Sequence, residues 1–354
     1  MNKVKKTHEL LIKHYKNHPK MQINDIFKYL FQSSFGCEHL VSDYSTALEF
    51  IKREYETVPK NTSIKTEALD GEYGRVYLSS LNEGLKPETL AKLFMLSAKK
   101  EKNGKANLEQ KIEAVKELIG SGDLPLNKNE FEKAVCEWRS LGYPAVRHSA
   151  VFREEYHPAY RVIANRYLDF LPLFAKIDAL LDNGKAIVAI EGGSASGKTT
   201  LAGILEEVYE CNVFHTDDFF LRPEQRTPER LAEIGGNVDR ERFCDEVVVS
   251  LKNNEAVRLR RFDCSTQTLG AEITVMPKKL TVVEGVYSTH LAFGRYFDLS
   301  VFLDIDKEYQ KQRILKRNSP GFAERFFNEW IPLENAYFAG TDIKKRSDVV
   351  IEIK

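Results

Sequence analysis

The sequence predicts an α/β domain with a parallel sheet, preceded by a mostly α-helical N-terminal domain. Three observations support this fold class. Apolar residues spaced three and four apart dominate from about residue 4 to residue 182, as in amphipathic helices. After Gly184 the pattern changes to short apolar runs separated by helical segments. The first of these runs passes through a glycine turn into a helical segment at 186–200, AIVAIEGGSASGKTT.

The N-terminal half predicts a series of helices separated by turn signals. A last helix is expected at about 160–181, because the following Asp182-Asn183-Gly184 suits a left-handed C-terminal cap. We place the domain boundary at this cap, which gives a helical accessory domain at 1–183 and a second domain at 184–354. The earlier expected helices are 23–35, 46–55, 87–97, 108–119 and 131–141.

The second half predicts strands that are buried on both faces. Their runs are rich in Val and Ile and lack polar alternation, which is typical of a parallel sheet covered by helices. In such sheets ligands bind beyond the carboxyl ends of the strands, so the residues that follow each run are candidates for function. The expected strands are 186–190, 212–215, 280–283, 300–303 and 349–353.

The charge balance favours a small substrate. Lys and Arg together number 52, as do Asp and Glu, so the chain carries no net charge at pH 7. Nonspecific binding of nucleic acid requires an excess of positive charge, which is missing here. We therefore expect a small-molecule substrate and no nucleic-acid partner.

The cysteines and the hydropathy of the chain indicate a cytoplasmic protein. The five cysteines are odd in number and show no C-x-x-C spacing, so neither a disulfide framework nor a zinc site is indicated. The apolar residues at 10–12 are too few for a signal peptide, and no apolar run approaches the length of a membrane span. No membrane partner is expected, and the sequence leaves a homo-oligomer open.

The segment 192–199 matches the phosphate-binding pattern G-x-x-x-x-G-K-[ST]. Glycines let successive backbone N–H groups turn toward phosphate oxygens, and the following helix adds its positive N-terminal end. Lys198 would reach the β- and γ-phosphates, and the Thr199 hydroxyl would bind Mg²⁺. The alternative is a glycine loop that matches by chance. The residues expected to bind the nucleotide are Gly192, Gly193, Ser194, Ala195, Ser196, Gly197, Lys198, Thr199 and Thr200.

Carboxylates follow two other predicted strands. Asp217 and Asp218 come just after 212–215, and Glu284 comes just after 280–283. Phosphoryl transfer needs a carboxylate that orients a hydroxyl and accepts its proton, together with oxygen ligands for Mg²⁺. Asp217 is our candidate base and metal ligand, and Glu284 would bind Mg²⁺ or the substrate hydroxyls. The alternatives are a helix cap for either aspartate and a solvated surface position for Glu284.

A basic helix is expected at 306–317, before the break Asn318-Ser319-Pro320-Gly321. Arg313 and Arg317 lie one turn apart on the same face of this helix. Arginines on a mobile lid can close over a triphosphate and neutralise the charge that develops during transfer. The alternative is an ordinary solvated helix face.

The order of these motifs resembles the uridine kinase and phosphoribulokinase family of P-loop kinases, over about 185–353. The loop GGSASGKTT resembles the phosphate loop of that family, and TDDFF at 216–220 resembles its D-S-F-Y element, whose Asp is the catalytic base. This resemblance implies that Asp217 is the base. GNVDR at 236–240 is similar to the N-F-D-H segment of the family, which implies that Asp239 holds substrate hydroxyls.

The same resemblance extends to two further segments. VEGV at 283–286 is similar to the F-E-G-I element, and LDIDKEYQKQRILKR aligns with the V-D-T-D lid helix, which implies that Arg313 is a lid arginine. The family reads its nucleobase with Y-D-F followed by a histidine, whereas this chain has RFDCST at 261–266. Phe262 and Asp263 are the corresponding substrate-binding candidates.

The resemblance implies an ATP- and Mg²⁺-dependent transfer of the γ-phosphoryl group to a hydroxyl of a nucleoside-like substrate, similar to uridine or cytidine. Because the base-reading segment departs from the family pattern, pantothenate, a sugar or a sugar phosphate stays open as the acceptor. A rival from another class is an ATP-binding sensor with little catalysis. Asp217 together with Asp239 favours catalysis, since a pure binder needs neither.

Two clusters in the N-terminal half stand outside this resemblance. FGCEH at 35–39 contains groups that a metal or catalytic site could use, but no second Cys lies near it and zinc is not indicated. Arg147, His148 and Arg161 could together bind an anion, because arginine matches the geometry of phosphate. The alternative is a set of hydrogen bonds between helices. We assign this half to no family.

Overall fold

A computed structural model of the chain describes residues 3–41, 43–60, 65–99 and 101–353. The chain divides into two compact units, Met1–Asp178 and Ala179–Lys354. The division falls within helix α9 (Leu171–Leu181), a few residues before the boundary predicted at 183/184.

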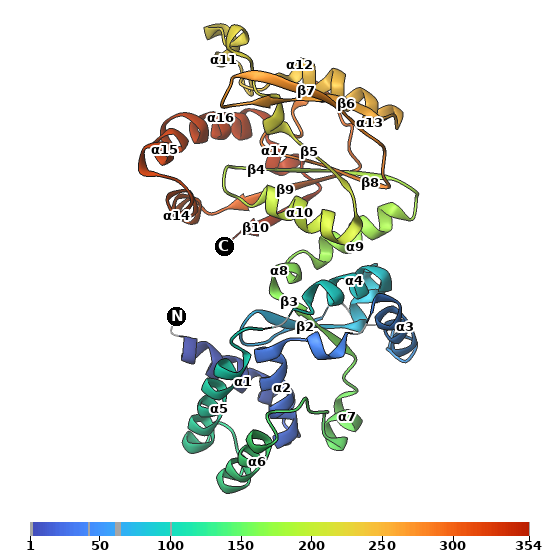
Figure 1. Ribbon diagram of the computed structural model, residues 1–354, viewed down its shortest axis with the longest axis vertical. Helices are drawn as coiled ribbons and strands as arrows, with labels where there is room; N and C mark the ends of the chain where they lie inside the picture. The colour runs from blue at the N-terminus through green and yellow to red at the C-terminus, as the bar shows by residue number, and fades with distance from the viewer. Residues whose placement is uncertain (1–2, 42, 61–64, 100, 354) are drawn as a thin grey trace. The chain divides into compact units, whose positions relative to one another are not determined.

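The N-terminal unit is built mostly from helices, drawn in blue to green in Figure 1. Their apolar faces pack together around α2, where the Phe27 ring stacks on Trp138 with centroids 4.4 Å apart. The α-helices are α1 (Lys3–Asn17), α2 (Ile23–Phe35), α3 (Tyr44–Tyr55), α4 (Pro87–Ser97), α5 (Gly104–Ser121), α6 (Lys128–Ser140), α7 (Ala150–Tyr156), α8 (Asn165–Leu168) and α9. Short 3-10 turns add η1 (Glu38–Leu40) and η2 (Leu78–Glu83).

This unit also contains a small antiparallel sheet with the order β1-β2-β3 (Thr66–Ala68, Tyr73–Tyr77 and Tyr160–Ala164). The helix expected at 160–181 is therefore wrong in its first part. Val162 and Ile163 are β-branched and buried, and they pair with β2. The helical periodicity of the segment is overridden by this pairing with a distant strand. Helix begins only at Asn165.

The C-terminal unit has a five-stranded parallel sheet with the order β10-β9-β4-β8-β5. All five strands occur where the sequence predicts them: β4 (Ala186–Gly192), β5 (Asn212–His215), β8 (Leu280–Glu284), β9 (Leu299–Ile305) and β10 (Val349–Ile353). In Figure 1, α10 lies on one side of this sheet, and α16 and the hairpin β6–β7 lie on the other. The predicted α/β fold with a parallel sheet, preceded by a mostly helical region, is confirmed.

The antiparallel hairpin β6–β7 (Val257–Asp263 and Thr268–Val275) was not expected. Most of its side chains are exposed, so it lacks the continuous apolar run of the central strands. The helices of this unit are α10 (Lys198–Tyr209), α11 (Pro228–Ala232), α12 (Arg240–Phe243), α13 (Val249–Asn253), α14 (Lys307–Arg317), α15 (Pro320–Arg325), α16 (Ile331–Thr341) and α17 (Ile343–Arg346). Shorter helical turns are η3 (Thr216–Phe219), η4 (Pro223–Gln225), η5 (Cys244–Val248), η6 (Leu291–Phe293) and η7 (Phe326–Trp330).

A buried apolar cluster joins the sheet to the hairpin and to α16. It includes Phe214 of β5, Val283 of β8, Leu259 of β6 and Tyr337 of α16. Because these elements share one core, the carboxyl ends of β5 and β8 are held against the hairpin and α16. Within the described ranges, no helix combines the length and the apolar character that crossing a bilayer requires.

Candidate active site

The phosphate loop connects β4 to α10 through residues 193–197. Gly192 has φ +144°, and a Cβ there would lie 2.7 Å from the carbonyl oxygen of Leu303 on β9. Gly197, the N-cap of α10, has φ +103°. Both positions therefore require glycine, for close approach at one and for left-handed backbone at the other. Ala195 adopts positive φ as well, at +60°.

Two side chains of the loop lie where an anion would satisfy them. Lys198 Nζ donates to the carbonyl oxygen of Gly193 at 3.0 Å, so the ammonium group sits over the loop. The Ser196 hydroxyl is buried and has no hydrogen-bond partner within the described part of the chain. An orphaned donor of this kind beside the N-terminus of a helix fits a phosphate group. Thr200 is exposed in the first turn of α10.

Glu284 and His215 lie side by side at the carboxyl ends of neighbouring strands, because β5 and β8 pair in the register His215↔Glu284. The Thr199 hydroxyl donates to Glu284 Oε1 at 2.9 Å, and His215 Nδ1 lies 2.7 Å from the same oxygen. Because Glu284 is only 5% exposed, water has little access to its carboxylate, and Thr199 and His215 supply its hydrogen bonds. The hydrogen bond that His215 donates to the Glu284 carboxylate raises the pKa of His215.

Asp217 follows β5 in the turn η3. Its carboxylate opens to solvent, yet the protein atoms around it desolvate the group and raise its pKa. Lys198 opposes this rise electrostatically, and Glu284 adds to it. The structure thus brings Asp217, Lys198 and Glu284 within electrostatic reach of one another. The oxygens of Thr199, Asp217 and Glu284 form the type of donor set that Mg²⁺ prefers.

Of the two lid arginines expected on α14, one contacts the loop. Arg313 donates through a terminal guanidinium nitrogen to the carbonyl oxygen of Ala195 at 2.9 Å. Arg317 is exposed and its guanidinium lies 5.5 Å from the centre of the Phe326 ring. Its predicted role toward the nucleotide stays a prediction.

The structure adds two residues that hold the loop and that carry no motif in the sequence. Glu334 of α16 is buried, and its carboxylate accepts from the Ser194 backbone N–H at 2.9 Å and from the Ser194 hydroxyl. Gln310 of α14 donates to the carbonyl oxygen of Ser194 at 2.8 Å. Burial raises the pKa of Glu334. A lone acidic residue in the mostly apolar segment 331–341 is the one signal that could have pointed to Glu334.

Glu191 is a third residue that sequence reasoning passed over. It is fully buried directly before the loop, and burial raises its pKa to about 7. Its carboxyl group accepts from the backbone N–H groups of Tyr287 and Thr289 at 2.9 and 3.1 Å. These bonds tie the segment after β8 to the end of β4, so Glu191 positions the strand ends that carry the site.

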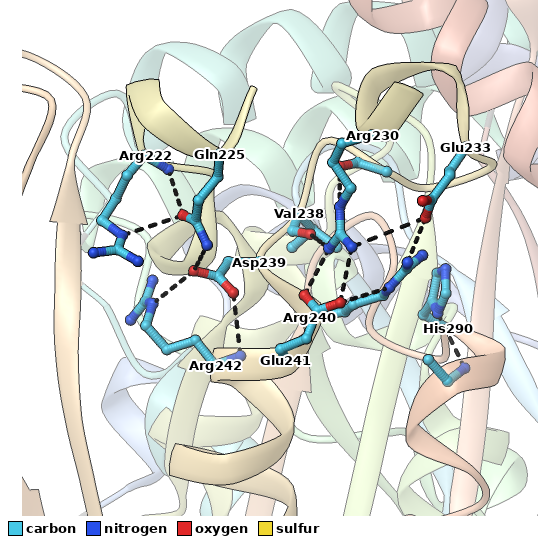
Figure 2. Close-up of polar contacts among 12 residues, drawn as sticks. Arg222, Gln225, Arg230, Glu233, Val238, Asp239, Arg240, Glu241, Arg242 and His290 are labelled. Carbon is cyan, nitrogen blue, oxygen red and sulfur yellow. Dashed lines mark hydrogen bonds and ion pairs between the residues drawn. The ribbon is translucent and has the colours of Figure 1, made fainter. Parts of the chain in front are cut away.

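Asp239 is 2% exposed, and Figure 2 shows its contacts. Its side chain caps α12 by accepting from the Arg242 backbone N–H at 3.2 Å, and Gln225 Nε2 donates to it at 3.0 Å. The Asp239 backbone N–H donates to the carbonyl oxygen of Phe219 at 2.7 Å. The last bond attaches the segment that carries Asp239 to the turn η3.

A network of arginines and glutamates holds the segment that precedes Asp239 in the sequence. Arg230 pairs with Glu241 at 2.7 Å and donates to the carbonyl oxygen of Val238 at 3.0 Å (Figure 2). Arg240 contacts both Glu233 and Glu241. The sequence shows these residues only as alternating charges, because the partners come from separate turns.

The hairpin places the two remaining substrate candidates differently. Phe262 is buried, with the Arg226 guanidinium 5.9 Å from the centre of its ring. Asp263 is exposed, and its Oδ1 accepts from the Ser265 backbone N–H at 2.7 Å, which shapes the hairpin turn. Asp263 is therefore engaged in the turn, while Phe262 lies beneath an arginine.

The cluster at 35–39 does not assemble as a metal site within the described residues. Cys37 is buried, where burial raises the pKa of its thiol to about 12, and Glu38 is exposed. The group of potential ligands that the described chain does bring together is His14, His18 and Glu67. Arg75 pairs with Glu67 at 2.9 Å and supplies the positive charge there.

Comparisons with known proteins point to uridine kinases, while no family model matches the chain. The uridine kinase of Chlamydia pneumoniae is 29% identical over 140 residues, which cover 37% of this chain and 61% of that enzyme. The uridine kinase of Staphylococcus haemolyticus is 26% identical over 182 residues, which cover 47% of this chain and 86% of that enzyme. A solved structure of a possible uridine kinase from Bacillus stearothermophilus aligns with 51% of this chain and 98% of its own length, at 24% identity and a TM-score of 0.38.

These matches cover about half of the chain or less and leave the rest unrecognised. The phosphate loop and the carboxylates at the strand ends all lie in the unit Ala179–Lys354, on a parallel sheet. The unit Ala179–Lys354 therefore resembles the P-loop kinase domain of uridine kinases.

Proposed function

We propose that the chain is an ATP- and Mg²⁺-dependent kinase that transfers the γ-phosphoryl group to a hydroxyl of a nucleoside-like small molecule. The observation that carries this proposal is the juxtaposition of the phosphate loop with Asp217 and Glu284 at the ends of adjacent strands. A protein that only binds ATP has no need of a desolvated carboxylate at this place.

Each residue has a distinct task in the proposed reaction. Lys198 and the amides of the loop hold the triphosphate, and Arg313 adds positive charge from α14. Asp217 accepts the proton of the acceptor hydroxyl while that oxygen attacks the γ-phosphorus and the bond to the bridging oxygen of ADP breaks. The raised pKa of Asp217 makes it a better proton acceptor than an ordinary aspartate.

Mg²⁺ would be held by the Thr199 hydroxyl with Asp217 or Glu284, and when bound it neutralises phosphate charge. Glu284 already accepts from Thr199, so its carboxylate also keeps that hydroxyl oriented. Asp239 and Phe262 are the proposed contacts of the acceptor, through its hydroxyls and its ring.

One observation favours a second class of acceptor. Asp263 is engaged by Ser265 in the hairpin turn, and the family's pattern of Y-D-F followed by a histidine is replaced here by Phe262-Asp263-Cys264 followed by Ser265 and Thr266. A small alcohol without a pyrimidine base, such as pantothenate, a sugar or a sugar phosphate, is therefore the second candidate.

The test is incubation with Mg-ATP and a panel of nucleosides, pantothenate and sugars, read by mass spectrometry for the gain of one phosphoryl group. The Asp217→Asn variant should lower kcat by about 10²–10⁴-fold and keep its affinity for ATP, because a positioned general base contributes about that much. Asp218→Asn is the matched control, since its carboxylate pairs with Arg261 at 3.3 Å. ATP binding with every acceptor unmodified would instead support a nucleotide-dependent sensor.

A further inference from the structure

The N-terminal unit has a large cavity of its own. Its volume is about 780 Å³, within the usual range for a small-molecule site. Its walls come from α2, η1, α3, α7 and β3, with one side chain from α4 and the segment before α7. All of these elements belong to the unit Met1–Asp178, so the cavity is separate from the phosphate loop.

The charged lining of this cavity is almost entirely basic. Lys28, Arg147, Arg153 and Arg161 face a single carboxylate, Glu54. Arg161 pairs with Glu54 at 2.8 Å, whereas Arg147 and Arg153 form no ion pair with any carboxylate of the described chain. Unpaired guanidinium groups that converge on a concave site are suited to an anion with several oxygens, because their N–H forks match phosphate geometry.

Lys28 gives a second sign of an anion-binding site. It is partly buried, and its ammonium group donates to the carbonyl oxygen of Val146 at 3.3 Å. Burial lowers its pKa to about 8, and the charges of Arg75 and Arg147 add to this effect. An anion in the cavity would offset the repulsion among these cations.

Another wall of the cavity is apolar and open to solvent. Phe50 is 49% exposed and Leu40 is 52% exposed, and both line the cavity together with Phe94. Large apolar side chains gathered at a concave surface mark ligand-binding sites more often than ordinary protein surface. The ligand should therefore carry an apolar or aromatic body beside its anionic group.

A chain of buried hydrogen bonds supports the basic wall. His148 Nδ1 lies 2.9 Å from Asp25 Oδ1, and His148 Nε2 lies 2.7 Å from the Tyr160 hydroxyl. Gln32 Oε1 accepts from the fully buried Arg75 at 2.8 and 3.0 Å. Buried polar networks of this kind contribute little to stability compared with apolar packing, but they fix the orientation of the groups that they connect.

We propose that this cavity binds a small phosphomonoester with an apolar or aromatic body. Lys28, Arg147 and Arg153 receive the phosphoryl group, and Phe50 contacts the body. The volume of the cavity fits a small molecule, and the several unpaired cations suit a dianion better than a single carboxylate. The site does not depend on the proposed kinase function, since no residue is shared.

The proposal is tested by calorimetric titration of the full chain with phenyl phosphate, phenol and inorganic phosphate. Arg147→Gln and Arg153→Gln should each weaken phenyl phosphate binding by at least about tenfold, because each removes a charge-assisted bond. Both side chains are exposed, so neither substitution disturbs the core. Arg258→Gln, the same change at an exposed position of β6, is the matched control and should bind as the wild type does.

Two further variants separate this cavity from the phosphate loop and test its apolar wall. Lys198→Met should leave phenyl phosphate binding unchanged, whereas loss of binding in that variant would locate the ligand at the loop and overturn the proposal. Phe50→Ala should reduce the preference for phenyl phosphate over inorganic phosphate. Absence of binding up to about 10 mM phenyl phosphate, or equal binding by wild type and both arginine variants, would also overturn it.

Discussion

Substituting Gly192 by alanine tests the geometry on which the kinase site depends. The residue has φ +144°, a region that side chains rarely adopt, and the new Cβ would lie 2.7 Å from the Leu303 carbonyl oxygen. Backbone strain of this kind costs about 1–3 kcal/mol, and the steric clash with a rigid strand costs about the same. Together they should destabilise the unit by about 2–6 kcal/mol.

Gly203→Ala provides a control of identical chemistry in the next element. Gly203 lies within α10, and nothing stands within 4 Å of the Cβ that the substitution adds. Replacing a helical glycine by alanine should therefore stabilise the protein by about 0.5–1 kcal/mol. The two substitutions are expected to move the free energy of unfolding in opposite directions.

Two assays are used: urea unfolding measures the free energy of unfolding, and titration of the folded protein with ATP measures binding. Gly192→Ala should lower the midpoint and weaken ATP binding, because the loop can no longer leave β4 along the same path. A Gly192→Ala protein that unfolds at the wild-type urea concentration and binds ATP equally well would refute the reasoning. Such a result would mean that the backbone at the end of β4 does not have the conformation described.

Three other predictions concern single side chains of the site. Ser196→Ala should leave the free energy of unfolding unchanged or raise it by about 1 kcal/mol, since the buried hydroxyl lacks a partner in the described chain, yet calorimetry should show weaker ATP binding. Arg313→Gln should lower kcat by about 10–10³-fold in a coupled assay, with a smaller effect on the KM for ATP, and an exposed-arginine control, Arg325→Gln, should match the wild type. Because the hydrogen bond to Glu284 raises the pKa of His215, this pair stabilises the fold fully below about pH 6.5 and loses its effect as the pH rises through the raised pKa. The stability difference between wild type and His215→Gln should therefore shrink above about pH 6.5, and a difference that grows with pH would contradict it.

Local patterns were good predictors of the elements that form the sheet. The strands at 212–215 and 349–353 begin and end where the predicted runs do. The expected burial on both faces is wrong for the edge strand β10, where Val350 and Glu352 are exposed because only β9 pairs with it. The strand β3 shows the opposite case. Its residues have a helical spacing that continues into α8 and α9, and only their pairing with β2 makes them a strand.

Some residues of the candidate site could likewise be predicted from local patterns, and others could not. The loop residues could be placed because glycine, lysine and threonine occur at fixed spacing along a continuous segment. Glu334 could not, since it lies 140 residues from Ser194 and reaches it only after α16 packs over the sheet. The basic cavity of the N-terminal unit was predicted in part, because Arg147, His148 and Arg161 were grouped as a possible anion site and all three line it. Lys28, Arg153 and the apolar wall were not predicted.

By itself the sequence determined the five strands of the parallel sheet and the position of the phosphate loop, because both depend on neighbours along the chain. Tertiary structure decided which partners hold that loop and which groups form hydrogen bonds with Asp239 and Asp263. It also decided which cations line the cavity of the N-terminal unit. The physical reason is that burial and pairing act between residues that packing brings together. The spacing of residues along a sequence does not specify which distant residues will be neighbours in the core.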